Sequence, residues 1–145
     1  MKNILVIHGP NLNLLGKRET NIYGEVTIEQ INTTLQDVAA KLGVQLHIVQ
    51  SNHEGEIVTM IGEASRKAMD GILINPAAYT HTSVAILDAL KGCSLPSVEV
   101  HLSNIYAREE FRHKSLTAPA AIGQVCGFGL QSYILGLKGL VLNIK

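Results

Sequence analysis

Two short runs of apolar residues constrain the fold of this chain more than any other feature of its sequence. They cover residues 4–7 and 72–74, and neither contains a polar side chain. An unbroken apolar run is typical of a strand that is buried on both faces, whereas a strand with one face in water alternates polar and apolar residues. The segments between such runs are long enough for helices. The sequence therefore predicts a parallel sheet that is covered by helices on both sides.

Helical patterns separate the predicted strands. Apolar residues recur with helical spacing from Ile28 to Leu42, and Thr27 with Gln30 has the pattern of a capping box. A second helix follows a turn at 51–55, and its predicted inner face extends to Ala68. The predicted strands are 4–7, 44–48, 71–75, 98–100 and 120–126, and the other predicted helices are 80–90 and 128–144.

This order of elements favours a flavodoxin-like α/β fold. Right-handed crossovers lead to a three-layer sandwich around a five-stranded parallel sheet of order 2-1-3-4-5. The 145 residues are enough for one domain with a sizeable core, so we expect a single domain over residues 1–145. Gly136 and Gly139 lie within the last predicted helix, where we expect them to permit close backbone packing within the chain or against another subunit.

Composition excludes several classes of partner. The 12 basic residues balance the 12 acidic ones, so neither nucleic acid nor an anionic membrane is expected to bind. Cys93 and Cys126 are too few and too far apart for a disulfide framework or a zinc site. The sequence begins with a strand pattern and has no apolar run of membrane-spanning length. A cytoplasmic location is therefore the default expectation.

Residues from three distant stretches are predicted to meet at one edge of the sheet. In the order 2-1-3-4-5 the first, third and fourth strands are neighbours, and their carboxyl ends line the crevice at the switch point. Asn11, Asn75 and His101 follow those ends. The polar loop 12–24, which carries Arg18 and Tyr23, is a candidate lid over this crevice.

Each candidate residue also has a structural interpretation. Arg18 could stabilise a phenolate of Tyr23 for use as a general base, or the two could be a solvated cation and a packed ring. His101 could be a satisfied, partly buried histidine. Glu99 lies on the same side of the strand and could hold its second ring nitrogen. Arg108 and Arg112 are expected on one side of a helical turn, where nearby glutamates could pair with them. Asp88 would ordinarily be a solvated helix residue.

Two alternative sites are disfavoured by spacing. Six residues separate Gly9 from Gly16 where a phosphate-binding P-loop has four, which argues against a nucleotide site. His81, His101 and His113 lack the spacing of a metal-ligand set. We therefore expect no metal and no cofactor.

Seven motifs together resemble one enzyme family. In order along the chain they are GPNLNLLG (9–16), RE (18–19), YG (23–24), QSNHEG (50–55), NPAAYTHTS (75–83), EVHLSN (99–104) and AREEFRHKS (107–115). Their identity, order and spacing closely resemble type II 3-dehydroquinate dehydratase over nearly the whole chain. Leu87 departs from the family pattern, where arginine is expected, and this bears on a subunit contact around the third predicted helix.

The resemblance implies a lyase of the shikimate pathway, which leads to the aromatic amino acids. Such an enzyme reversibly dehydrates 3-dehydroquinate to 3-dehydroshikimate through an enolate. The implied catalytic residues are Tyr23 as general base, Arg18 as its activating cation, Asn11 as the residue that positions a water, and His101 as general acid.

The resemblance also implies a set of substrate-binding residues and an assembly. The substrate would be held by Asn75, His81, Leu102, Ser103, Arg112 and, from a neighbouring subunit, Asp88. Family members are similar in forming homododecamers that are built from trimers.

A different mechanism for the same reaction is disfavoured, and two other functions remain as alternatives. The unrelated type I enzyme uses a lysine Schiff base, but none of the eight lysines lies within a buried strand pattern. A flavodoxin-like module for flavin or a phosphorylated ligand would need a phosphate-binding loop after the first strand, where Pro10, Leu12 and Leu14 stand. An assembly protein without activity would make the set of Arg18, Tyr23 and His101 coincidental.

Overall fold

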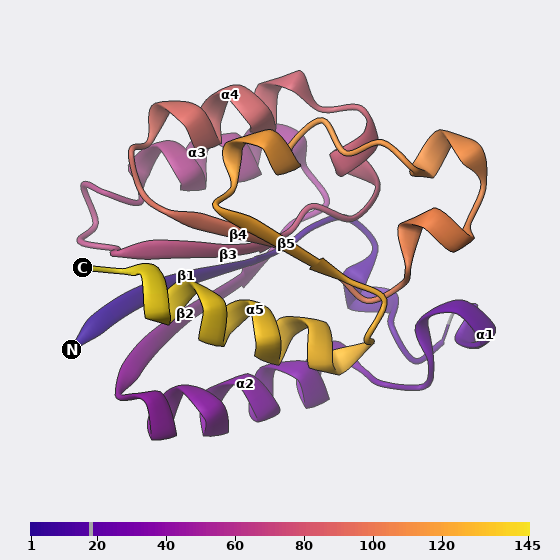
Figure 1. The fold of residues 1–145 in the computed structure, drawn as a ribbon, viewed down its shortest axis with the longest axis horizontal. Coiled ribbons are helices and arrows are strands. Elements are labelled where there is room, and N and C mark those ends of the chain that lie inside the picture. The colour runs from indigo at the N-terminus through magenta and orange to yellow at the C-terminus, as the bar shows by residue number, and fades with distance from the viewer. Residues whose placement is uncertain (18) are drawn as a thin grey trace.

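A five-stranded parallel sheet forms the middle layer of the structure, a computed structural model that describes residues 1–17 and 19–145 (Figure 1). The strands run in the order β2-β1-β3-β4-β5, which confirms the predicted topology. Their bounds are β1 Lys2–His8, β2 Val44–Gln50, β3 Gly71–Asn75, β4 Ser97–His101 and β5 Gly123–Cys126. The two termini meet at the amino edge of this sheet, where Lys2 Nζ donates to the Lys145 carbonyl over 2.8 Å.

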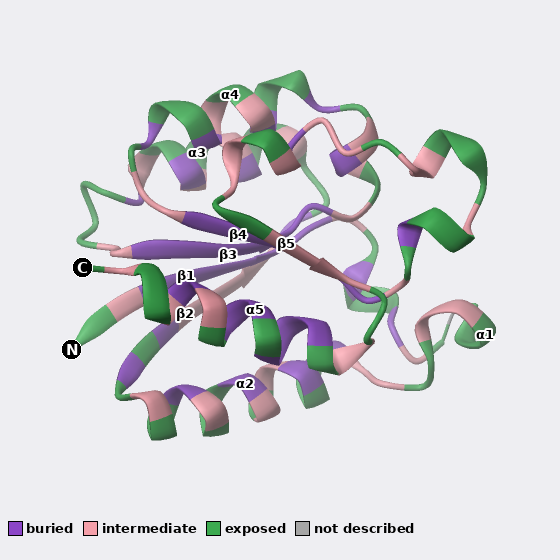
Figure 2. Ribbon diagram, in the orientation of Figure 1, coloured by how far each residue is buried: buried purple, intermediate pink, exposed green. Residues whose placement is uncertain are grey.

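Helices cover both faces of the sheet. Helices α2 (Ile28–Leu42) and α5 (Leu130–Asn143) pack on one face, and α3 (Glu54–Glu63) and α4 (Val84–Gly92) pack on the other (Figure 1). Alternate residues of β1 therefore enter two different cores: Ile4 and Val6 face α2 and α5, and Leu5 and Ile7 face α3 and α4. Figure 2 shows β3 and β4 buried along their length and β1 buried from Ile4 onward, as the apolar runs predict.

Local sequence signals explain where the helices begin and end. Thr27 and Gln30 form the predicted capping box at the start of α2, and Gly43 ends this helix in the left-handed conformation that glycine adopts without strain. Ser83 caps α4 by accepting a hydrogen bond from the Ile86 amide. Among the described residues, no helix is long and apolar enough to cross a membrane.

Several predicted boundaries are wrong. The helix predicted from residue 80 begins at Val84, because a 3-10 helix at Ala77–His81 precedes it. Ala68 lies beyond the end of α3, is exposed and has a φ of 64°, so it does not belong to the inner face of that helix. Strand β5 begins at Gly123 because Ala118–Ala120 form a 3-10 turn around Pro119, which lacks the amide hydrogen of a strand residue. The last helix begins at Leu130, two residues after its predicted start.

Short turns at the carboxyl edge of the sheet carry many of the candidate residues. The loop after β1 contains a 3-10 turn at Leu12–Leu14 and the short helix α1 (Thr20–Tyr23). The segment after β4 contains two 3-10 turns, Ile105–Ala107 and Glu110–Arg112, where one helical turn is predicted. Arg108 lies between these two turns, so Arg108 and Arg112 do not share a helical face.

The two glycines of α5 have different surroundings. A Cβ atom on Gly136 would overlap Val100 Cγ1, so this glycine lets α5 approach β4 closely. Apart from its chain neighbours and the backbone of its own helix, no described atom lies within 4 Å of a Cβ built on Gly139. The expected close packing is therefore present within the chain at Gly136, and Gly139 has no such contact among the described residues.

Candidate active site

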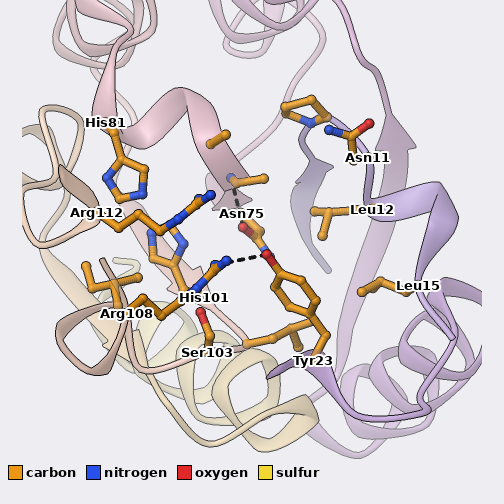
Figure 3. A pocket seen from close by; sticks show the side chains of 15 residues that line it. Asn11, Leu12, Leu15, Tyr23, Asn75, His81, His101, Ser103, Arg108 and Arg112 are labelled. Atoms are coloured by element: carbon orange, nitrogen blue, oxygen red, sulfur yellow. Dashed lines mark hydrogen bonds between the residues drawn. The ribbon is translucent and has the colours of Figure 1, made fainter. Parts of the chain in front are cut away.

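A pocket of about 160 Å³ opens at the carboxyl edge of the sheet (Figure 3). It lies where the segments that follow β1, β3 and β4 come together, as the strand order predicts. Eight of the predicted site residues line it: Asn11, Tyr23, Asn75, His81, His101, Leu102, Ser103 and Arg112. Of the other two, Arg18 lies outside the described residues, and Asp88 is exposed on α4 and does not line the pocket.

His101 is held by a buried carboxylate. It is the last residue of β4, and its Nε2 lies 2.8 Å from Oε2 of Glu99, two residues earlier on the same side of the strand. Since a carboxylate only accepts, Nε2 carries the hydrogen and Nδ1 is the nitrogen left to exchange a proton. The predicted pairing of Glu99 with His101 is therefore confirmed.

Glu99 lies at the centre of a buried hydrogen-bond network. Thr80 and Ser115 donate to its Oε2 over 2.8 Å, Gln124 donates over 3.0 Å, and Thr117 donates to Oε1. Burial alone would raise the pKa of Glu99, but the hydrogen bonds and the charge of His101 outweigh it and lower that pKa below its ordinary value. Glu99 is therefore a fixed negative charge beneath the imidazole.

Tyr23 contacts a guanidinium that the predicted set of site residues omits. Arg108 Nη1 donates to the Tyr23 hydroxyl over 2.9 Å, and its Cζ lies 5.2 Å from the centre of the tyrosine ring (Figure 3). Glu19 Oε2 lies 3.8 Å from Arg108 Nη2. Within the part of the chain that the structure describes, no acceptor reaches the buried Nε of Arg108. Arg108 can therefore act on the phenol and still donate to a ligand.

The wall formed by His81 and Arg112 is polar and partly cationic. His81 Nδ1 donates to the Lys114 carbonyl over 2.9 Å. Burial lowers the pKa of His81, and the nearby charges of His101 and Arg112 add to this effect against the hydrogen bond to Lys114. Arg112 forms the predicted ion pair with one glutamate, Glu109, over 2.6 Å, yet it also lines the pocket. The predicted ion pair of Arg112 is thus confirmed, and the same side chain also lines the pocket.

A small network fixes the backbone beside Asn11. Asn11 has a φ of 66°, in the left-handed region, and its amide donates to Asn52 Oδ1 over 3.0 Å. Gln50 Nε2 donates to the same oxygen and to the Gly9 carbonyl. Gln50 and Asn52 lie in the quoted QSNHEG motif, and this motif is the signal that could have identified them.

Three comparisons with known proteins agree. The family model described as "Dehydroquinase class II" matches residues 2–141. A 3-dehydroquinate dehydratase of Trichodesmium erythraeum is 62% identical over 143 residues, which are 99% of this chain and 95% of the relative. A 3-dehydroquinate dehydratase of Nostoc is 59% identical over a match that covers 99% of this chain and 97% of the Nostoc protein.

Solved structures give the same answer. The crystal structure of type II dehydroquinase from Butyrivibrio crossotus is 48% identical and superposes with a TM-score of 0.94 over 96% of this chain and 97% of that one. The Propionibacterium acnes type II dehydroquinase is 40% identical, with a TM-score of 0.93 over 99% and 98%. Sequence, fold and pocket together show that the chain belongs to the class II dehydroquinase family.

Proposed function

We propose that the chain is a lyase of the shikimate pathway that reversibly dehydrates 3-dehydroquinate to 3-dehydroshikimate. One observation carries the proposal: a tyrosine in contact with a guanidinium and a histidine in contact with a buried carboxylate line the same pocket. Such a pair supplies the base and the acid that an elimination of water requires. The substrate follows from the relatives, which are 3-dehydroquinate dehydratases.

Tyr23 is the base in this mechanism. It takes the proton from the carbon next to the ketone, and the electrons of that carbon–hydrogen bond form an enolate. The Arg108 guanidinium, 2.9 Å from the phenol oxygen, favours the phenolate form because it donates a charge-assisted hydrogen bond. Arg18, which precedes Tyr23 in the same loop, is proposed to support the same phenolate.

The enolate oxygen is stabilised by donors that are fixed before the reaction begins. Asn11 is proposed to position a water that donates to this oxygen. The hydrogen bond from the Asn11 amide to Asn52 supports the role, because it holds the residue in its left-handed conformation without relying on the substrate.

His101 completes the elimination. The enolate collapses to the conjugated double bond, and the departing hydroxyl takes a proton from Nδ1 of His101 to leave as water. Glu99 stabilises the imidazolium before this step because it accepts from Nε2 and lies in a buried, weakly screened site. The proton balance closes, since Tyr23 gains one proton and His101 loses one.

The remaining residues of the pocket hold the substrate. Arg112 and the Leu102–Ser103 backbone are proposed to bind the carboxylate, and Asn75 and His81 the hydroxyls. Asp88 is proposed to reach the pocket of a neighbouring subunit in a trimer, four of which form a dodecamer; its exposed position on α4 leaves it available for such a contact. A cytoplasmic location is part of the same proposal.

The test is ultraviolet absorbance of the purified protein mixed with 3-dehydroquinate. The product contains a conjugated enone, so we expect absorbance to grow, with and without borohydride pretreatment in the presence of substrate. Inactivation by borohydride would leave the assigned reaction standing, but it would show that the mechanism uses a lysine Schiff base instead of the tyrosine base. The absence of any enone signal would overturn the proposed function.

A further inference from the structure

A buried chain of polar side chains runs behind the pocket and ends at Asn75. His8 Nε2 lies 2.8 Å from Asn32 Oδ1, and His8 Nδ1 lies 2.8 Å from the Tyr133 hydroxyl. Asn75 Nδ2 donates to the same hydroxyl over 3.0 Å. His8 and Asn75 are register partners at the ends of β1 and β3, and Tyr133 reaches them from the first turns of α5. The chain thus joins α2, β1, α5 and β3.

The direction of every hydrogen bond in this chain follows from one backbone donor. The Ala77 amide can only donate, so the oxygen of Asn75 must be the atom that faces it, 3.0 Å away. Nδ2 of Asn75 therefore faces Tyr133, whose oxygen accepts. The phenol hydrogen is left to donate to His8 Nδ1, so His8 carries its own hydrogen on Nε2 and donates it to Asn32.

We propose that Tyr133 and His8 are positioning residues that fix Asn75 as a hydrogen-bond donor toward the substrate. The Asn75 side chain makes no third hydrogen bond within the described residues, which leaves the second hydrogen of Nδ2 for the pocket that Asn75 lines. A fixed donor selects a ligand oxygen with a lone pair, such as a hydroxyl of the substrate. This inference rests on the proposed function and adds the residues that set the polarity of one substrate contact.

Burial makes the arrangement rigid. His8 and Tyr133 are 0% exposed and Asn75 is 2% exposed, so an alternative pattern would leave a donor or acceptor without a partner in the protein interior. Burial also lowers the pKa of His8 to about 4 and raises that of Tyr133. At neutral pH the histidine is then uncharged and the phenol keeps its hydrogen, which are the two states that the chain requires.

Tyr133→Phe tests the proposal, because it removes the acceptor of Asn75 Nδ2 and leaves the shape of the ring unchanged. We expect KM for 3-dehydroquinate to rise about tenfold, as for the loss of one hydrogen-bonding partner, with kcat changed much less. Tyr106→Phe is the matched control, since it removes a hydroxyl from an exposed tyrosine outside the pocket. This control should keep the wild-type KM.

A double-mutant cycle separates positioning from a general loss of packing. If Tyr133 acts through Asn75, adding Tyr133→Phe to Asn75→Ala should change KM by less than about twofold, because the residue to be positioned is gone. Equal effects of Tyr133→Phe in both backgrounds, or a wild-type KM in the single variant, would overturn the inference. An inactive wild-type enzyme would instead overturn the proposed function.

Neutron diffraction of the deuterated wild type tests the same chain without any substitution. We expect deuterium on Nε2 of His8, no deuterium on Nδ1, and the Tyr133 deuterium directed toward His8. Deuterium on Nδ1 would reverse the chain and overturn the proposal, even if the Tyr133 variant failed to fold.

Discussion

Arg108 connects the two halves of the candidate site at the scale of single residues. It is a residue of the turns after β4, and it donates to a phenol in the loop after β1 that is 85 residues away in sequence. The strand order places His101 at the predicted crevice and Tyr23 in a loop over it, and the resemblance implies their roles. The spacing of Arg108 and Arg112, however, predicts one helical turn. Two 3-10 turns separate them instead. No local pattern encodes a contact of such long range, so the sequence could not assign it.

Removing the Arg108 charge should weaken the base. We expect Arg108→Met to lower kcat by roughly 10- to 100-fold, the effect of losing one hydrogen bond from a charged donor. Arg108→Lys keeps the charge without the planar fork and should lose less. Steady-state kinetics in the enone assay measures kcat and KM of both variants. If kcat stayed at the wild-type value and only KM rose, Arg108 would be a substrate-binding residue and not a partner of the base.

At the scale of elements, the periodicity of apolar residues is sufficient to predict a strand or helix wherever that element buries a regular face. Unbroken apolar runs identified β1 and β3, and the capping box placed the start of α2. The predicted boundaries are wrong where backbone geometry, and not burial, determines where an element begins or ends. Pro119 lies in a 3-10 turn before β5, and Ala68 is exposed beyond the end of α3. The short turns around the pocket have no period at all.

The glycines of α5 give a matched pair of substitutions. Gly136→Ala should lower the free energy of unfolding by roughly 1–3 kcal/mol, because its methyl group would overlap Val100. Gly139→Ala meets no described atom and should raise that free energy by up to about 1 kcal/mol through better helix propensity. Denaturant unfolding of both variants against wild type measures the difference. A destabilising Gly139→Ala would show that its face is covered in the folded protein.

At the scale of the whole molecule, buried ionisable groups make stability depend on pH. The pKa of His8 falls from 6.5 to about 4, mainly through burial and against the hydrogen bond that His8 donates to Asn32. As the pH falls, His8 therefore takes up a proton in the unfolded chain before it does so in the folded one. Its protonation does not affect the free energy of unfolding above pH 6.5 and lowers it as the pH falls toward 4. The total loss from this group is about 3 kcal/mol.

Urea unfolding between pH 7 and 4.5 measures this dependence. We expect the wild type to lose stability more steeply below pH 6.5 than His8→Asn, in which the asparagine oxygen can still accept from Tyr133. Glu99 is present in both proteins. Its lowered pKa gives stability that is lost only as the pH falls through the acidic range of carboxyl groups, so its effect cancels in the comparison. Parallel curves for the two proteins would show that His8 does not bind a proton on unfolding.

The topology of the sheet determines which segments form the pocket. The order β2-β1-β3-β4-β5 brings the loop after β1 beside the end of β4. The central claim is that this meeting point places a tyrosine base opposite a histidine acid. The most direct test is the initial rate of enone formation by Tyr23→Phe, with Tyr106→Phe as control and substrate binding followed by calorimetry. We expect at least about a 100-fold loss of kcat with binding retained. Near-normal turnover by Tyr23→Phe would contradict the account.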